Sequence, residues 1–219
     1  MTGSVIGGDA PVPVLIQPDG LKGLLGMPPS PNGLVIFAHG SGSGRLSPRN
    51  THVADALHRA GLATLLLDLL TPDEELDRAN VFDIPLLASR LAGAAAWARR
   101  VPELERLSIG YFGASTGAGA ALLAAAAPDA EVAAIVSRGG RPDLAGARAL
   151  AHVRAPTLLI VGSRDLPVID LNRIAMRHLR GETELVIVEG ATHLFEEPGT
   201  LDEVVRHAMR WFLHHLGKE

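Results

Sequence analysis

A serine in a turn of small residues is the first feature of this sequence that suggests chemistry. Ser115 lies in the segment Gly113-Ala-Ser-Thr-Gly117, between an apolar run that predicts a strand and an alanine-rich run that predicts a helix. The pattern G-x-S-x-G is typical of a turn that presents a nucleophilic serine, because bulk two residues to either side would collide with the sharp turn. The following helix would place its positive end near a developing oxyanion. Small-residue turns of this kind are also common without catalysis, so the motif alone leaves a packing role for Ser115 open.

Two more reactive side chains follow later apolar runs. Asp165 comes soon after the run 157–162, and His193 follows the run 184–190 in a Gly-Ala-Thr setting. Chemistry on a parallel sheet gathers on the loops beyond the carboxyl ends of the strands, so we expect both side chains close to Ser115. A serine, an acid and a histidine in that chain order are a known form of the catalytic triad.

Other acids and histidines compete for these roles. Asp68 ends an early predicted strand, where it would hold a loop, and Asp143 is placed to cap a helix. His39 ends a strand, and we interpret it as a structural hydrogen-bonding residue rather than a base. Chain order favours Asp165 as the acid. Most other histidines fall within predicted helices and are interpreted as surface residues: His52, His58, His178, His207, His214 and His215.

Backbone N–H groups beside the serine would supply an oxyanion hole. The loop His39-Gly-Ser-Gly-Ser-Gly-Arg45 follows an apolar run and would bring one N–H group close to the serine turn. We expect that group to be the N–H of Ser41, and the second donor to be the N–H of Thr116.

The glycine-rich segments do not match nucleotide-binding motifs. The sequence contains no G-x-x-x-x-G-K-[ST] pattern. The segments beginning at Gly117 and at Gly40 both lack the third glycine of a dinucleotide fingerprint. Nucleotide binding is therefore disfavoured.

The elements that must position these residues alternate along the chain. The predicted strands are 12–16, 34–39, 62–70, 107–113, 132–137, 157–162 and 184–190, with 21–26 as an additional edge strand. The predicted helices are 50–60, 84–100, 116–126, 143–151, 169–179 and 201–216. Most strands are apolar throughout, which indicates cover on both faces. We therefore predict one α/β domain over residues 1–219, with a mostly parallel sheet and helices on both sides. Thr200 is the predicted N-cap of the last helix, with Glu203 completing a capping box.

Composition narrows the function further. The sequence has no cysteine, which excludes disulfides, thiolate metal sites and a cysteine nucleophile, and which is compatible with the cytoplasm. The formal net charge of −4 gives no global reason to expect a nucleic acid or an anionic membrane as partner. The amino-terminal stretch 1–14 lacks the pattern of a signal peptide, and no apolar stretch reaches the length of a membrane span. We expect a cytoplasmic protein; the sequence carries no indication of its oligomeric state.

Four motifs in the right order give the chain a family resemblance. They are HGSGSG at 39–44, GASTG at 113–117, GSRD at 162–165 and GATHLFEEPG at 190–199. With them the chain resembles an α/β-hydrolase over nearly its whole length, and it is similar to the small dienelactone-hydrolase-like proteins. The resemblance implies that His193 takes the proton of Ser115, that Asp165 orients the imidazole, and that no metal or organic cofactor is needed.

The chain departs from the family pattern in one respect and lacks a feature of some relatives. Dienelactone hydrolases proper use a cysteine nucleophile, so their substrate is not carried over to a chain that has Ser115. The chain also resembles hydrolase-like domains that are joined to phosphoribosyltransferase domains in other proteins. No phosphoribosyltransferase signature, an acidic pair followed by a small-residue phosphate loop, is visible here.

Substrate size and charge are suggested by the loops. Only residues 138–142 separate the strand 132–137 from the next helix, so no large lid fits, whereas the acidic segment 71–83 is predicted to be a mobile surface loop. An open site for small soluble substrates follows. Four arginines on the same loop edge would either bind an anionic group of the substrate or pair with nearby acids and stiffen loops. They are Arg45, Arg138, Arg141 and Arg164, with Arg49 beside the first of them.

The leading functional prediction is a serine hydrolase of small carboxylic esters or lactones. Two alternatives stay open: acyl transfer or perhydrolysis on the same triad, and a non-catalytic ligand-binding module that keeps the fold.

Overall fold

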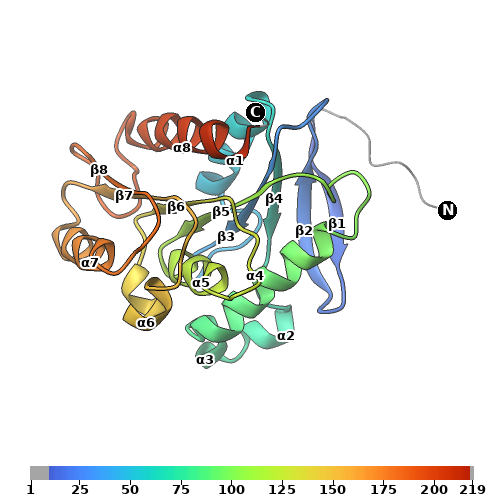
Figure 1. The fold of residues 1–219 in the computed structure, drawn as a ribbon, viewed down its shortest axis with the longest axis horizontal. Coiled ribbons are helices and arrows are strands. Elements are labelled where there is room, and N and C mark those ends of the chain that lie inside the picture. The colour runs from blue at the N-terminus through green and yellow to red at the C-terminus, as the bar shows by residue number, and fades with distance from the viewer. Residues whose placement is uncertain (1–9, 218–219) are drawn as a thin grey trace.

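The computed structural model describes residues 10–217 of the chain. Within these residues eight strands form one sheet in the order β1-β2-β4-β3-β5-β6-β7-β8 (Figure 1). The strands β3 to β8 run parallel, and β1 and β2 are antiparallel to their neighbours. The strands are β1 (Val12–Ile16), β2 (Leu21–Gly26), β3 (Leu34–Ala38), β4 (Ala63–Leu67), β5 (Ile109–Ala114), β6 (Ala134–Arg138), β7 (Thr157–Gly162) and β8 (Thr183–Val188). The predicted mostly parallel α/β sheet is confirmed.

Helices cover both faces of the sheet. They are α1 (Pro48–Arg59), α2 (Pro72–Glu75), α3 (Arg78–Val81), α4 (Ile84–Ala98), α5 (Thr116–Ala125), α6 (Ala147–Leu150), α7 (Leu166–Met176) and α8 (Thr200–Leu216), with a 3₁₀ helix, η1, at Pro142–Ala145. Figure 1 shows α1 and α8 on one side of the sheet and α4, α5 and α7 on the other. The connection from β6 to β7 holds only η1 and α6, so no large lid is inserted there.

The continuous apolar runs form strands that are buried on both faces. In β3, Val35 and Phe37 pack in the cluster that contains residues of α1 and α8, and Ile36 packs in the cluster that contains residues of α4 and α5. All five residues of β3 are buried. Since side chains of a strand alternate between the two faces, a strand covered on both sides must be apolar at every position.

Several predicted helix bounds differ from the structure, and local chemistry explains the main differences. The helices α1 and α7 begin earlier than predicted, at Pro48 and Leu166, because proline is accepted in the first turn of a helix. The predicted helix 143–151 is two short helices, interrupted at Gly146, whose φ is +80°. The N-cap of α8 is Gly199 rather than Thr200. The Thr200 hydroxyl donates instead to the Glu197 carbonyl oxygen at 2.8 Å, so the predicted capping box does not form.

The segment 71–83 is structured, contrary to the predicted mobile loop. It forms the helices α2 and α3, and a capping box joins Thr71 and Glu74 at the start of α2. The Thr71 N–H donates to the Glu74 carboxylate at 2.8 Å, and this bond lowers the pKa of Glu74. Arg90 of α4 pairs with both Glu74 and Asp19. The pattern Thr-x-x-Glu with proline at the first helical position was the sequence signal for this helix.

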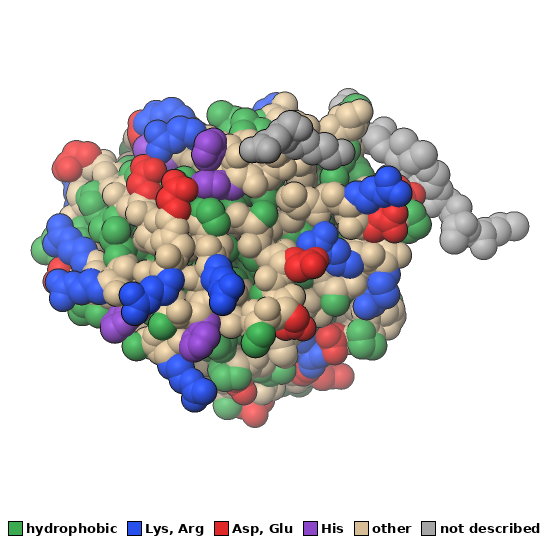
Figure 2. All heavy atoms as spheres, in the orientation of Figure 1, with side chains coloured by type: hydrophobic (Ala, Val, Ile, Leu, Met, Phe, Trp, Pro, Cys, Tyr) green, Lys and Arg blue, Asp and Glu red, His purple; other side chains and the backbone are tan. Residues whose placement is uncertain are grey.

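Charged side chains of both signs are spread over the face that Figure 2 shows, between apolar and uncharged regions. No helix among residues 10–217 is both long enough and apolar enough to cross a membrane. The expectation that the amino-terminal stretch is not a signal peptide concerns mainly residues 1–9. These residues lie outside the described part of the chain.

Candidate active site

Ser115 lies at a sharp turn between β5 and α5. Its backbone has φ +51° and ψ −120°, in a region that side-chain-bearing residues adopt only when the surroundings enforce it. A Cβ atom on Gly113 would lie 2.5 Å from the Ala118 Cα, and one on Gly117 would lie 2.2 Å from the Ala38 carbonyl oxygen. Both glycines of the G-x-S-x-G pattern are therefore required by close backbone contacts, as the sequence predicted.

The structure brings the three predicted triad side chains together. The Ser115 Oγ lies 3.3 Å from the His193 Nε2, and the His193 Nδ1 lies 2.6 Å from the Asp165 Oδ2. The Asp165 side chain is mostly buried, and 38% of the His193 side chain is exposed. A buried carboxylate beside a partly exposed imidazole that reaches a hydroxyl is the arrangement that activates a serine.

Asp165 occupies the N-cap position of α7 but does not cap it. Its side chain makes no capping hydrogen bond and contacts His193 instead. An aspartate before Leu166-Pro167 would ordinarily be interpreted as a helix cap. The carboxylate is thus not engaged in capping and is available to the histidine.

The loop that carries His193 is fixed by a carboxylate that follows it. The Thr192 N–H donates to the Glu197 carboxylate at 3.1 Å, and hydrogen bonds from Thr192 lower the pKa of Glu197. Phe195 has φ +56° and is buried, two residues after the histidine. The histidine is therefore presented by a short loop in a constrained conformation.

The competing acids and His39 have structural partners, although the predicted helix cap at Asp143 does not form. Asp68 accepts a hydrogen bond from the Arg45 N–H at 2.8 Å and pairs with its side chain. Asp143 binds Arg141 through two hydrogen bonds of 2.8 and 2.7 Å instead of capping a helix. The Nε2 of His39 accepts from the Leu69 N–H at 3.0 Å. Neither of these acids contacts His193.

The two predicted oxyanion donors lie beside the serine, and they differ in their present partners. The Ser41 N–H donates to the Thr116 Oγ1 at 3.0 Å. The Thr116 N–H, at the start of α5, has no acceptor among residues 10–217. The Thr116 N–H is thus free to bind an oxyanion, whereas the Ser41 N–H must first be released by the threonine hydroxyl.

The four candidate arginines have different surroundings. Arg45 and Arg141 pair with the acids described above, so the loop-stiffening interpretation applies to them. Arg138 is 6% exposed, so its side chain is buried and is not a candidate for binding an anionic group from solvent. Arg164 is exposed, and its N–H donates to the Ala191 carbonyl oxygen at 3.0 Å.

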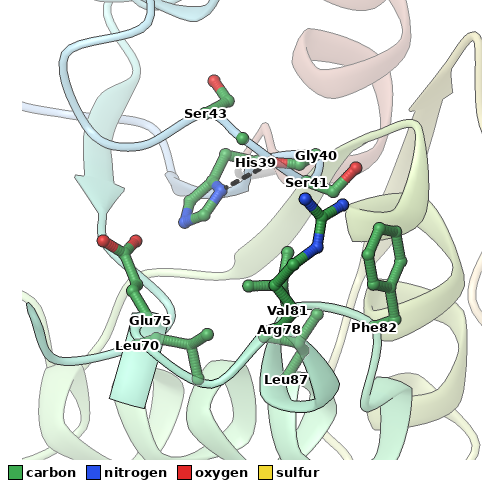
Figure 3. Close-up of a pocket in the computed structure, with 11 residues that line it drawn as sticks. His39, Gly40, Ser41, Ser43, Leu70, Glu75, Arg78, Val81, Phe82 and Leu87 are labelled. Atoms are coloured by element: carbon green, nitrogen blue, oxygen red, sulfur yellow. Dashed lines mark hydrogen bonds between the residues drawn. The ribbon is translucent and has the colours of Figure 1, made fainter. Parts of the chain in front are cut away.

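A cavity of about 510 Å³ adjoins the Ser41 loop (Figure 3). One wall is the polar loop 39–43, and the opposite wall is apolar, with Leu70, Val81, Phe82 and Leu87. Its volume falls in the usual range for small-molecule sites.

Two charged residues of this cavity were missed by sequence reasoning. Arg78 and Glu75 both line it, and the Arg78 guanidinium points toward the Ser41 loop (Figure 3). Arg78 has no carboxylate within ion-pair distance among the residues that the structure describes. The capping box at Thr71 is the sequence signal that could have found them, because it predicts a helix at the start of this segment. The helices α2 and α3 place Glu75 and Arg78 in the wall of the cavity. Among residues 10–217 no cluster of three or more His, Asp and Glu is arranged to hold a metal ion.

Known proteins share this fold, and some of them are similar to the chain in sequence. A family model described as an alpha/beta hydrolase domain matches residues 31–211. A crystal structure of dienelactone hydrolase from Anabaena variabilis is 56% identical, has a TM-score of 0.89, and covers 94% of this chain and 97% of its own. The esterase Est1E from Butyrivibrio proteoclasticus is 17% identical with a TM-score of 0.80, over 95% of this chain and all of its own, and shows the shared fold alone.

The chain belongs to the α/β-hydrolase family. Within that family it is similar to dienelactone hydrolase. Curated relatives from two strains of Mycobacterium tuberculosis, which carry a provisional phosphoribosyl transferase name, are 58% identical over 208 residues. That match covers 95% of this chain and 47% of the relatives, so the chain spans about half of their length.

Proposed function

We propose that the chain is a serine hydrolase that cleaves carboxylic esters or lactones of small molecules. The observation that carries the proposal is the continuous contact from the Asp165 carboxylate through His193 to the Ser115 hydroxyl, at 2.6 and 3.3 Å. When Nδ1 donates to Asp165, the Nε2 of a neutral imidazole is an acceptor for the serine proton.

The reaction follows from these positions. His193 takes the proton of the Ser115 hydroxyl, and Oγ attacks the ester carbonyl carbon. The tetrahedral oxyanion accepts a hydrogen bond from the Thr116 N–H, and from the Ser41 N–H once the Thr116 hydroxyl turns away. The carbon–oxygen bond of the ester breaks, and the leaving alkoxide takes its proton from His193. Water, deprotonated by the same imidazole, then releases the acid from Ser115.

The cavity beside the Ser41 loop is the proposed site for the part of the substrate attached to the carbonyl group. Its apolar wall suits a hydrocarbon portion, and Arg78 replaces Arg45 and Arg141 as the candidate for an anionic group of the substrate. The dienelactone substrate in the name of the Anabaena relative is not carried over to this chain. Dienelactone hydrolases proper use a cysteine nucleophile, whereas the proposed nucleophile here is Ser115.

The name of the mycobacterial relatives refers to a phosphoribosyl transferase activity, which is different from hydrolysis. We infer that this activity belongs to the half of those proteins that the present chain does not span. In the present chain, the residues that support hydrolysis are Ser115, His193 and Asp165.

A fluorophosphonate probe tests the proposal directly. The protein is incubated with the probe and its intact mass is measured, beside Ser115→Ala, His193→Ala and the control Ser89→Ala, which alters an exposed serine of α4. We expect one adduct on the unaltered protein and on the Ser89 variant, and none on the other two. No adduct on the unaltered protein would contradict the proposal and favour the ligand-binding alternative.

Acyl transfer shares the same acyl-enzyme, so the probe does not separate it from hydrolysis. A short activated ester is supplied with and without a competing alcohol or hydrogen peroxide, and the products are identified by mass. We expect the free acid as the main product. A transferred acyl group as the main product would replace hydrolysis by acyl transfer or perhydrolysis.

A further inference from the structure

The segment Arg138-Gly-Gly-Arg141, at the end of β6, holds the serine turn from both sides. The Ser115 N–H donates to the Arg138 carbonyl oxygen at 3.2 Å, and the Arg141 N–H donates to the Ser115 carbonyl oxygen at 3.0 Å. These two bonds bracket the one residue of the turn whose φ is +51°. A backbone conformation of this kind persists only when its neighbours determine it.

The same segment lies directly against the catalytic histidine. Gly139 has φ +51°, and a Cβ atom on it would lie 3.0 Å from the His193 carbonyl oxygen and 3.6 Å from the His193 Cε1. The Gly139 N–H donates to the Ile160 carbonyl oxygen at 2.8 Å. The fully buried Asn172 of α7 donates to the Gly140 carbonyl oxygen at 3.0 Å. The segment is thus fixed by β7 and α7 while it touches His193.

The side chain of Arg138 extends toward the rest of the histidine loop. Its guanidinium lies 5.9 Å from the centre of the Phe195 ring, within the usual range of a cation–π contact. One Nη donates to the Asn50 Oδ1 of α1 at 3.4 Å. Arg138 therefore links the loop that follows His193 to the amino-terminal turn of α1.

Burial of the charged Arg138 side chain costs free energy. The side chain makes no ion pair with a carboxylate among residues 10–217, and its Nε has no hydrogen-bond acceptor there. Burial, with a contribution from the charge of Arg49, lowers the pKa of Arg138 to about 10, so the group still carries its charge at neutral pH. An apolar residue of similar length would remove this desolvation cost, so stability alone does not account for an arginine here.

We propose that the segment 138–141 is a positioning element that sets Ser115 and His193 at reacting distance, with the Arg138 guanidinium holding the histidine loop through Phe195. Arg138 touches neither the substrate nor the reacting atoms, so it is a positioning residue. Its effect on rate rests on the proposed hydrolase function, whereas its effect on the placement of His193 does not.

The test combines kinetics with thermal stability. Arg138→Met keeps the length of the side chain and removes the charge, Arg138→Lys restores a charge without the planar guanidinium, and Arg173→Met is a matched control at an exposed arginine of α7. For Arg138→Met we expect kcat on a short ester to fall by about 100-fold with KM unchanged, since small misplacements of reacting groups cost about that much. We expect its Tm to be equal or higher, Arg138→Lys to recover part of kcat, and the control to match the unaltered protein.

A second measurement does not depend on catalysis. The proton between the His193 Nδ1 and Asp165 is expected to give a low-field ¹H NMR signal, because the two atoms are 2.6 Å apart. This signal should shift or broaden in Arg138→Met, and also in Gly139→Ala, where the added methyl group presses on His193. It should stay in place in Arg173→Met.

The outcomes separate the two proposals. If the unaltered protein forms no fluorophosphonate adduct, the proposed hydrolase function fails, and the NMR comparison still decides the positioning role. If Arg138→Met keeps both kcat and the low-field signal, the positioning role is overturned. A lower Tm in Arg138→Met, with kcat unchanged at temperatures below the unfolding transition, would also overturn the positioning role. Arg138 would then contribute to stability only. If Arg138→Met does not fold, Arg138→Lys and Gly139→Ala give the same comparison.

Discussion

On the triad side of the candidate site, three side chains follow three strands of one sheet, and close backbone contacts fix the serine turn. On the cavity side, one wall includes the short helices α2 and α3, and the ion pair between Arg90 and Glu74 joins α2 to α4. The contacts at Gly113 and Gly117 leave no space for a methyl group, whereas Arg78 is exposed and points into an open cavity.

This difference predicts which side of the candidate site tolerates amino-acid substitutions. The serine turn is held by backbone atoms, so its geometry depends on small residues and on the sheet itself. The cavity side is held by side chains, so substitutions there should alter which substrate binds without altering the reaction. The following predictions test this contrast, from the largest expected effect to the smallest.

The largest effect is expected for the acid of the triad. Asp165→Asn keeps the shape of the side chain but no longer favours the imidazole tautomer that accepts the serine proton. We expect kcat to fall by about 10⁴-fold, as in serine proteases with the equivalent change, with a smaller effect on KM. Steady-state kinetics on a short ester measure both. Asp143→Asn, which alters an acid that binds only Arg141, is the control, and an equal loss there would refute the assignment of the acid.

The next largest effect is expected for a glycine of the serine turn. In Gly117→Ala the methyl group would lie 2.2 Å from the Ala38 carbonyl oxygen, so the backbone must move. Overpacking of this kind typically costs about 1–3 kcal/mol of stability, and we expect the displaced Ser115 to lose most of its reactivity with the fluorophosphonate probe. Denaturant unfolding and the labelling rate measure the two effects. Gly20→Ala, in the turn between β1 and β2, is the control: no atom lies within 4 Å of the added methyl group, and its φ of +69° adds strain without overlap.

On the cavity side, a change should separate binding from chemistry. Arg78→Gln removes the charge that points toward the Ser41 loop. For an ester with a nearby carboxylate we expect KM to rise by about 10-fold with kcat unchanged, because a charged hydrogen bond to a substrate contributes about that much. For a neutral ester of the same size we expect no change. An equal loss of kcat on both esters would break the contrast between the two sides.

The smallest effect is expected at the end of the histidine loop. Because hydrogen bonds from Thr192 lower the pKa of Glu197, the folded protein favours its charged form. The stabilisation is therefore present above the usual pKa of a glutamate, about 4.3, and is lost as the pH falls through the lowered value. We expect Glu197→Gln to have a slightly lower Tm than the unaltered protein at pH 7, and the difference to close as the pH falls through the lowered pKa of Glu197. A difference that does not narrow as the pH falls from 7 would show that the charge of Glu197 is not its cause.

Several local features could be predicted from the sequence and others could not. The continuous apolar runs predicted the buried strands, since a strand covered on both faces needs apolar residues throughout. The start of α8 was predicted wrongly, because Thr200 and Glu203 fit a capping box while the preceding Pro198-Gly199 turn already supplies the helix start. The segment 71–83 was predicted as a loop because its acidic composition outweighed the capping signal at Thr71.

The sequence by itself determined the parallel α/β fold and the candidate residues of the proposed chemistry. Strand burial, glycine spacing and the order of Ser115, Asp165 and His193 are all local patterns along the chain. Only the tertiary structure decided which side chains are satisfied and which are free. The separate surroundings of Arg138 and Arg141 show this, because two arginines three residues apart carry the same sequence signal. Arg141 finds Asp143 at the surface, while Arg138 is enclosed between α1 and the histidine loop. The physical reason is that the burial of Arg138 depends on Asn50 and Phe195, which are remote from it in sequence, whereas the partner of Arg141 is only two residues away.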